Sequence, residues 1–432
     1  MSRLLYDLAT WLAQPLLRRK LQRRGAAEPG YLEAVDERFG RYSTARPEGA
    51  GPLVWLHAVS LGETRAAAIL LAALRERMPS MRLLLTHGTA TGRAEGLKLL
   101  RPGDVQVWQP WDTRGAVRRF LRHFRPDVGV LMETEVWPNL VLESRAHGVP
   151  LALANARLSA RSLRGAERAG WLMRPAYRAL AAAWAQTEAD AQRLRQIGAP
   201  VAGVFGNLKF DAEPDAALLA RGKAWHVWSA RPVVMLASSR EGEEAEFLGR
   251  LRDLAATTET AGRADAAHWP QWLIVPRHPQ RFDAIAELIL DQGFSLSRRS
   301  QWADGPPVTA EVWLGDSLGE MPAYYALADV ALLGGSFAPL GGQNLIEAAA
   351  CGCPLVMGPH TFNFAEAAEM AEAAGAARRV PDLGAGLTVA LAWLTDAVGH
   401  TGRRQVALDF SRAHRGAAMR SAEAVAGLLR RA

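Results

Sequence analysis

The stretch LVWLHAVSLGETRAAAILLAAL, residues 53–74, contains a strand, a turn and a helix in succession. Its first five residues form an apolar run with the length of a buried strand, and residues 66–74 form an apolar helical stretch. Gly62 lies in the turn between them and lets the backbone reverse tightly. A buried strand followed by a helix is the unit from which parallel sheets with helices on both faces are built.

The same unit recurs through the first half of the chain. We expect strands at 81–86, 105–109, 128–132 and 150–154, and helices at 89–100, 116–124 and 139–146. Residues 157–198 are expected to be helical, with alanine-rich and arginine-rich faces. Strands that alternate with helices indicate a doubly wound α/β domain.

The alternation restarts after a polar stretch with Pro and Gly at 206–215. Further strands are expected at 233–237, 272–275, 312–314, 330–333 and 355–357, and further helices at 241–254, 282–291, 322–328, 345–350 and 364–375. The sequence therefore predicts three parts: an N-terminal segment, 1–24, and two Rossmann-like domains, 25–213 and 214–432. Residues 257–268 are expected to be a surface loop. Two such domains predict a cleft, with ligands beyond the carboxyl ends of the strands.

The N-terminal segment has the pattern of an amphipathic helix. Asp7, Thr10 and Gln14 fall on one face, and the other face carries Leu4, Leu5, Leu8, Trp11 and Leu12. A basic cluster follows at 18–24. The apolar stretch is shorter than the roughly 20 residues of a bilayer span. We expect this helix to lie on an anionic membrane surface, although a helix docked on the protein's own core would give the same pattern.

The composition narrows the class of partner. The formal net charge of +7 comes mostly from arginine and favours an anionic partner. Clustered basic residues with interleaved aromatics are absent from the sequence, which argues against nucleic acid. Cys351 and Cys353 fit no disulfide framework or common zinc pattern, so we interpret them as small apolar residues in a reducing compartment.

Several common site motifs are missing from the sequence. A Gly-x-Gly-x-x-Gly does not follow the first strand, and the chain has neither a Walker A motif nor an Asp-x-Asp pair. The histidines do not fall at metal-ligand spacing on one element. These features argue against a dehydrogenase and a phosphate-loop ATPase, and we expect neither a metal nor a cofactor.

Two acidic motifs follow strands of the first domain. Glu63 stands where the helix after the first strand begins, where it is either a helix-capping residue or a base that faces the cleft. The dipole of the helix is expected to lower its pKa and keep it ionised. Glu133 and Glu135 follow the strand at 128–132 and are further candidates for the site. The alternative is that they cap the next helix.

The second domain has polar motifs at the ends of its strands that suit a nucleotide. Arg277 follows one strand and could hold a phosphate through two nitrogens. Residues 316–320 follow another strand and could read a base. The glycine-rich segments 334–336 and 341–344 precede a helix start, where N–H groups bind phosphate, and Glu347 one turn later could bind ribose hydroxyls.

The chain resembles the transferases of lipopolysaccharide synthesis that act on Kdo, the eight-carbon acidic sugar 3-deoxy-D-manno-octulosonic acid. The resemblance extends along nearly the whole chain. The matching motifs are HAVSLGET (57–64), TATG (89–92), ETEVWPN (133–139), LANARLS (153–159), GNLKFD (206–211), PRHPQRF (276–282), GGSF (334–337) and GPHTFNF (358–364). The chain departs from many members at Arg240 and Gln343, where histidine is common, and at Leu345 and Ile346, where Pro-Leu is commoner.

The resemblance implies a GT-B fold of two doubly wound domains and an inverting, metal-independent transfer. The donor would be CMP-Kdo and the acceptor a lipid A precursor, lipid IVA, at the cytoplasmic face of the bacterial inner membrane. Glu63 would be the general base, and Glu133 and Lys209 would stabilise the transition state. The implied nucleotide-binding residues are Pro276, Arg277, Ser317, Leu318, Gly319, Asn344, Leu345, Ile346 and Glu347.

Two other functions stay open on the sequence. One is another enzyme of the same architecture, such as a UDP-sugar transferase or a UDP-sugar epimerase. The other is a membrane-bound nucleotide or carbohydrate sensor without catalysis. Competition binding of CMP against UDP distinguishes the first alternative from a Kdo transferase. A sensor would bind the donor but would not release CMP when donor and acceptor are mixed.

Overall fold

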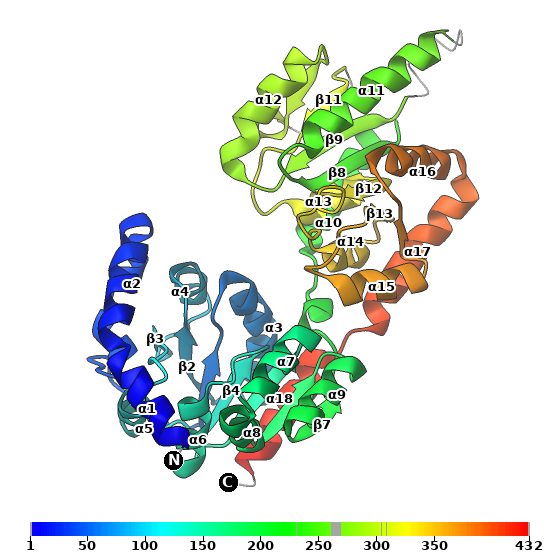
Figure 1. Ribbon diagram of the computed structural model, residues 1–432. Helices are drawn as coiled ribbons and strands as arrows, with labels where there is room; N and C mark the ends of the chain where they lie inside the picture. The colour runs from blue at the N-terminus through cyan, green and yellow to red at the C-terminus, as the bar shows by residue number, and fades with distance from the viewer. Residues whose placement is uncertain (1, 230, 261–268, 304, 308, 431–432) are drawn as a thin grey trace. The chain divides into compact units, whose positions relative to one another are not determined.

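The computed structural model describes residues 2–229, 231–260, 269–303, 305–307 and 309–430 (Figure 1). The chain forms two compact units. Unit 1 comprises Met1–Asp211 and His414–Ala432, and unit 2 comprises Ala212–Ala413. The break after residue 211 lies close to the predicted boundary. The C-terminal segment, which the sequence assigned to the second domain, instead packs on unit 1.

Within the described residues, unit 1 contains a parallel seven-stranded sheet in the order β3-β2-β1-β4-β5-β6-β7. Its strands are β1 Leu53–His57, β2 Arg82–His87, β3 Val105–Trp108, β4 Val128–Met132, β5 Leu151–Ala156, β6 Ala182–Ala185 and β7 Val201–Val204. Its helices are α1 Ser2–Leu12, α2 Gln14–Ala27, α3 Leu61–Arg77, α4 Ala90–Leu97, α5 Arg114–Phe124, α6 Pro138–Ala146, α7 Ala160–Arg168, α8 Gly170–Arg178, α9 Glu188–Ile197 and α18 Ala417–Leu429.

Helices bury both faces of this sheet. Leu53 and Trp55 of β1 point into a core with α5, α6, α8 and α9, whereas Val54 and Leu56 point into a second core with α3 and α18. All five residues of β1 are buried, as the continuous apolar run predicted. The C-terminal helix α18 thus completes the core of unit 1. This packing explains why the C-terminal segment belongs to unit 1 and not to unit 2.

One part of the predicted secondary structure of unit 1 was wrong. Residues 157–198 were expected to be helical, but the strand β6 lies among the helices α7, α8 and α9. The buried sequence of β6 is Ala-Ala-Trp-Ala. Alanine favours helices and is depleted in strands, so only burial between β5 and β7 makes this segment a strand.

Unit 2 repeats the architecture, with a described seven-stranded parallel sheet in the order β10-β11-β9-β8-β12-β13-β14. Its strands are β8 Val233–Ser239, β9 Gln271–Pro276, β10 Leu296–Arg298, β11 Val312–Leu314, β12 Val330–Leu333, β13 Leu355–Met357 and β14 Ala377–Arg379. Its helices are α10 Ala216–Ser229, α11 Glu243–Thr260, α12 Phe282–Asp291, α13 Met321–Leu327, α14 Leu345–Ala350, α15 Ala365–Ala373, α16 Leu383–Thr395 and α17 Ala397–Ala413.

The predicted loop at 257–268 is only partly tested. Helix α11 continues to Thr260, so residues 257–260 are helical and not a loop. Residues 261–268 lie outside the described part of the chain.

The strand order places a switch point in each unit. In unit 1 the chain runs from β1 outward through β2 and β3, then returns to the other side of β1 with β4. In unit 2, β8 has β9 on one side and β12 on the other. Loops beyond the carboxyl ends of these central strands diverge and leave room for ligands. The doubly wound α/β architecture predicted from the sequence is therefore confirmed.

Candidate functional site

Glu63 lies in the first turn of α3, directly beyond β1. Ser60 is the N-cap of this helix, and its hydroxyl oxygen accepts the Glu63 N–H at 3.4 Å. The Glu63 carboxylate reaches back, accepting the Val59 N–H at 2.9 Å and the Ser60 hydroxyl at 3.1 Å. This arrangement resembles a capping box, with the Val59 N–H in place of the backbone N–H of the N-cap residue. The capping role considered from the sequence is therefore present, and it holds the carboxylate at the switch point of unit 1.

The expected effect on the proton affinity of Glu63 was wrong. Burial raises its pKa, and the negative charges of Glu135 and Glu133 raise it further. The Val59 N–H and His57 act in the opposite direction but do not prevail. The helix-end argument considered only the local helix, whereas burial of the carboxyl group has the largest effect on its pKa, and two carboxylates from the loop after β4 add to it. A raised pKa makes Glu63 a stronger base.

Glu133 begins the loop after β4 in a strained backbone conformation. Its φ is 55°, in the left-handed region that side chains other than glycine and asparagine avoid. Its N–H donates to Ala154 O at 3.0 Å, and its own carbonyl accepts the Arg157 N–H at 3.3 Å. These bonds to the end of β5 impose the conformation. Strain held in this way is common at functional sites.

Lys209 reaches the same group of charges from the 3₁₀ turn Leu208–Asp211, which follows β7. Burial lowers its pKa, and the charges of Glu133 and Glu63 oppose that effect. The turn is fixed at both ends: Leu208 N–H donates to Asn155 at 3.1 Å, and Asp211 accepts the Ala418 N–H of α18 at 2.7 Å. The three predicted catalytic residues, from three separate loops, thus act on one another electrostatically.

In unit 2, Arg277 follows β9 and is exposed. Its backbone N–H donates to Ser239 O at 3.0 Å, and its Nε donates to Gln343 Oε1 at 3.1 Å. This contact uses Nε and leaves the two terminal nitrogens of the guanidinium outside it. The predicted phosphate arginine and the glycine-rich segment therefore meet. Pro276, the last residue of β9, is buried.

Ser317, Leu318 and Gly319 form the loop after β11. The Ser317 hydroxyl lies 2.5 Å from both Glu320 Oε2 and the Tyr324 hydroxyl. Leu318 is 71% exposed, and Gly319 has a φ of 80°, which favours glycine. This loop thus presents backbone groups and one exposed apolar side chain.

The remaining predicted nucleotide residues lie at the start of α14. Asn344 is the N-cap residue, and its Oδ1 is buried without a hydrogen-bond partner among the described residues. Leu345 and Ile346 are each 1% exposed, so their side chains belong to the core and only their backbone N–H groups could meet a ligand. Glu347 is half-buried one turn into the helix.

Comparison with known proteins gives the family. Residues 33–212 match the family model described as 3-Deoxy-D-manno-octulosonic-acid transferase (kdotransferase). The chain is 47% identical to the 3-deoxy-D-manno-octulosonic acid transferase of Bordetella pertussis, over 98% of this chain and 99% of that one. It is 31% identical to the Haemophilus influenzae transferase of the same name, over 85% and 84%. The chain belongs to the Kdo transferase family.

Membership makes the protein a glycosyltransferase that transfers Kdo in lipopolysaccharide biosynthesis. Among solved structures, a glycosyltransferase from Rickettsia africae is similar, with a TM-score of 0.57 at 11% identity. The match covers 88% of this chain and all of that one, and it indicates a shared GT-B fold. The UDP-sugar and sensor alternatives are not supported by the family assignment.

Two carboxylates of the Kdo transferase were missed at the sequence level. Glu243, at the start of α11, is 2% exposed and accepts four backbone N–H groups, those of Arg240, Gly335, Phe337 and Ala338. Glu244 accepts both terminal nitrogens of Arg281 at 2.7 and 2.8 Å. Their signal was the pair of adjacent acids in ASSREGEE, which also suits an ordinary helix start in solvent.

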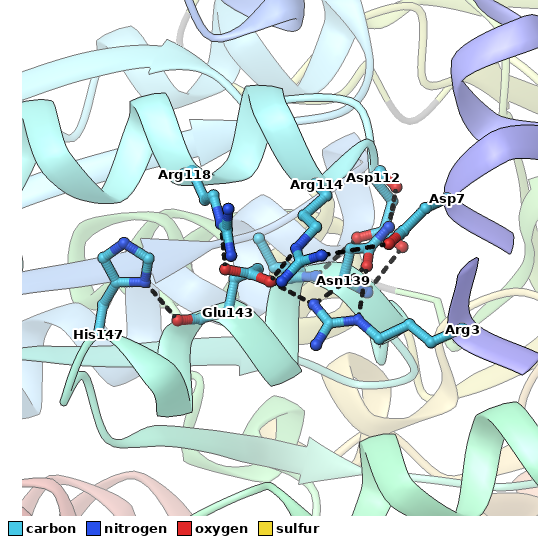
Figure 2. Close-up of polar contacts among 9 residues, drawn as sticks. Arg3, Asp7, Asp112, Arg114, Arg118, Asn139, Glu143 and His147 are labelled. Atoms are coloured by element: carbon cyan, nitrogen blue, oxygen red, sulfur yellow. Dashed lines mark hydrogen bonds and ion pairs between the residues drawn. The ribbon is translucent and has the colours of Figure 1, made fainter. Parts of the chain in front are cut away.

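The N-terminal helix of the transferase docks on unit 1 through its polar side (Figure 2). Arg3 bonds Glu143 and Asn139 of α6, and the Tyr6 hydroxyl donates to Asp112 at 2.7 Å. Asp7 lies 3.9 Å from Arg114. Glu143 is buried and also receives Arg114 and Arg118, at 3.0 and 2.7 Å. Polar groups therefore hold this helix in place.

The opposite side of α1 is apolar and open. Its exposed side chains are Leu4, Leu5, Leu8, Trp11 and Leu12, each more than half exposed. The predicted division into two faces is thus confirmed, and the apolar face is not the one that contacts the protein. None of the helices in the described ranges combines the length and the hydropathy that crossing a bilayer requires.

Proposed function

We propose that this Kdo transferase takes Kdo from CMP-Kdo and attaches it to a lipid A precursor, lipid IVA, with inversion at the anomeric carbon. The observation that carries the proposal is the placement of Glu63. Its carboxylate has a raised pKa and lies at the switch point of unit 1 with Glu133 and Lys209. A carboxylate with raised proton affinity suits the removal of a hydroxyl proton.

The reaction is one displacement. A glucosamine hydroxyl of the acceptor loses its proton to Glu63 while its oxygen attacks the anomeric carbon of Kdo. The bond from that carbon to the phosphate oxygen breaks, and CMP leaves with the electron pair. Lys209 offsets negative charge on the donor carboxylate or phosphate as this charge develops. General-base assistance of this kind is worth about 10²- to 10⁴-fold in rate.

Unit 2 would hold the cytidine nucleotide. Arg277, which contacts Gln343 through Nε, is suited to bind the phosphate through its terminal nitrogens. Glu347 is suited to accept hydrogen bonds from the ribose, and the backbone of 317–319 to read the base. Pro276, Asn344, Leu345 and Ile346 shape the same segments and would contribute backbone groups. Neither a metal nor a cofactor enters this scheme.

The substrate is an anionic lipid, and the open apolar face of α1 suits a membrane surface. We place the transferase at the cytoplasmic face of the bacterial inner membrane, with α1 in the interface and the basic residues 18–24 near anionic headgroups. Part of that basic cluster also stabilises the protein itself, because the Arg18 guanidinium lies 3.9 Å from the centre of the Phe39 ring. Nucleic acid has no part in the proposal.

Glu63→Gln tests the base. The protein is incubated with CMP-Kdo and lipid IVA, and the products are weighed by mass spectrometry. Glu63→Gln should lose transfer by about 10²-fold or more while it binds CMP as tightly as the wild type in calorimetry. Glu76→Gln, an exposed glutamate on the same helix, serves as the matched control and should retain activity. Full transfer by Glu63→Gln would exclude the base role, and failure of the wild type on lipid IVA would exclude this acceptor.

A further inference from the structure

Glu135 lies two residues after Glu133 but has different partners. Its carboxylate accepts the Trp137 indole N–H at 2.7 Å and lies 3.9 Å from His57 Nε2. The Glu133 carboxylate instead lies 3.9 Å from Arg157 and acts on Lys209. The side chain of Glu135 is only 16% exposed, so its negative charge is poorly screened by water.

His57 is held by a chain of hydrogen bonds inside the sheet. It is 1% exposed, and its Nδ1 lies 2.9 Å from the hydroxyl of Thr86, its direct neighbour across β1 and β2. The Trp55 indole already donates to that hydroxyl oxygen at 2.8 Å. Nδ1 also lies 3.1 Å from the Thr86 carbonyl oxygen. The two contacts with Thr86 hold the ring so that Nε2 faces Glu135.

This arrangement fixes the charge of Glu135. Burial, the largest single influence, raises its pKa, but the His57 ring and the Trp137 indole together outweigh burial and bring the pKa below its ordinary value. Glu135 therefore stays ionised at pH values where Glu63 still takes up a proton. The His57 ring, held by Thr86, orients the Glu135 carboxylate.

Several other charged or titratable groups act on Glu63 or contact its neighbours, and the effect of Glu135 must be separated from theirs. They are His57 of β1, His87 of β2, Glu133 of the loop after β4, Arg157 after β5 and Lys209 after β7. Burial lowers the pKa of His87 to about 3, so this ring is neutral at working pH. Of the two acidic neighbours that act on Glu63, Glu135 has the larger effect.

We propose that the Glu135–His57 pair sets the charge beside Glu63: His57 positions Glu135, and Glu135 holds a fixed negative charge beside the base and so strengthens it. The proposal rests on the proposed role of Glu63 as the base. Neither residue contacts the substrate in this scheme: both act through Glu63. The chain Trp55, Thr86, His57 and Glu135 links the interior of the sheet to the edge where the reaction takes place.

The pH dependence of single-turnover transfer tests the pair. In Glu135→Gln the negative charge is lost, so the pKa of Glu63 should fall, and the acidic limb of the rate profile should move to lower pH. The plateau rate should drop about tenfold because the base is weaker, while the KM for CMP-Kdo changes less than about twofold. Glu135→Asp keeps the charge and should keep the limb near that of the wild type. Glu95→Gln on α4 is the control for removal of a distant charge.

The outcomes separate this idea from the proposed function. An active Glu63→Gln variant would exclude the base itself, whereas a folded Glu135→Gln variant with an unmoved acidic limb would overturn the pair alone. If Glu135→Gln does not fold, two variants of His57 carry the test. His57→Gln keeps an N–H donor toward Glu135, so the acidic limb of its rate profile should stay near that of the wild type. His57→Leu has no such donor, so its acidic limb should move away from the wild-type position. Identical profiles from these two variants would overturn the proposal.

Discussion

The Glu243 carboxylate accepts the backbone N–H of Gly335 at 2.7 Å. The same carboxylate accepts N–H groups of Arg240, Phe337 and Ala338 at 2.9 to 3.3 Å. The loop after β12 therefore wraps around a buried negative charge that comes from α11. Gly335 in turn accepts the Gly342 N–H at 2.8 Å, which ties this loop to the segment that carries Gln343. Glu243 thus organises the loops proposed for the nucleotide without being placed to touch it.

Replacement of Glu243 by Gln should loosen these loops. Gln offers one acceptor oxygen in place of two, so at least one buried N–H loses its partner, at a cost of about 1–3 kcal/mol. We expect lower thermal stability of the protein and CMP affinity reduced about tenfold or more, measured by calorimetry. Glu246→Gln, a half-exposed residue on the same helix, should change neither. Unaltered CMP binding by a folded Glu243→Gln variant would contradict the role assigned to Glu243.

The fold was predictable where burial leaves a continuous record in the sequence. Strand β1 is apolar up to its last residue, His57, and is buried throughout, and its predicted range coincides with the observed one. Strand β7, Val-Ala-Gly-Val, is half exposed at an edge of the sheet and too short to give a signal. Strand β6 is mostly alanine and was taken for helix. The strands that the sequence did not predict are those whose structure depends on neighbours distant in the sequence.

The site shows the same division. The position of Glu63 follows from a strand, a glycine-containing turn and a helix, all local in sequence. Its proton affinity does not, because it depends first on burial and then on Glu135 and Glu133, which only the pairing of β1 with β4 brings near. The role of Glu243 also depends on a distant loop, that of Gly335. Sequence patterns therefore locate these groups but do not predict their interactions.

Ser60 gives a test of how Glu63 is held. Ser60→Ala removes the N-cap oxygen and the hydroxyl that donates to the carboxylate. We expect a loss of about 1 kcal/mol in the free energy of unfolding, and a fall in turnover because the carboxylate is less well oriented. Urea unfolding and transfer assays measure the two effects.

A second N-cap serine separates the effect of Ser60 on the orientation of Glu63 from its effect on the stability of the protein. Ser159 is the N-cap of α7 and accepts the Ser162 N–H at 3.1 Å, but it lies in a helix that carries no proposed site residue. Ser159→Ala should cost similar stability and leave turnover unchanged. Equal turnover in the two variants would refute the orienting role of Ser60.

His226 makes the stability of unit 2 depend on pH. Its Nε2 lies 3.0 Å from Asp329, and this hydrogen bond raises the pKa of His226 above its ordinary value of 6.5, although burial opposes it. A raised pKa means that the folded state binds the proton more tightly. The added stability is therefore complete below the ordinary pKa and is lost as the pH rises through the folded value. Since the side chain is 40% exposed, the effect should be small.

The measurement is the difference in urea midpoint between the wild type and His226→Gln across about pH 5 to 9. The wild type should have its largest advantage at the acidic end and lose it toward the alkaline end. A difference that stays constant with pH would show that the imidazolium does not contribute, and that any advantage comes from a neutral hydrogen bond.

The open face of α1 provides the test of membrane association. Leu4, Leu8 and Trp11 are 65%, 53% and 63% exposed, and the helix is docked by other residues, among them Arg3 (Figure 2) and Tyr6. Replacing the three apolar residues by Ser should thus leave the fold intact and weaken binding to vesicles that contain anionic lipid, because each buried methylene contributes about 0.8 kcal/mol. Trp171→Ser, an exposed tryptophan on α8, is the control and should bind as the wild type does. Vesicle sedimentation measures both. If the triple variant binds as well as the wild type, α1 is not the anchor, and the charges of residues 18–24 would have to account for any association that remains.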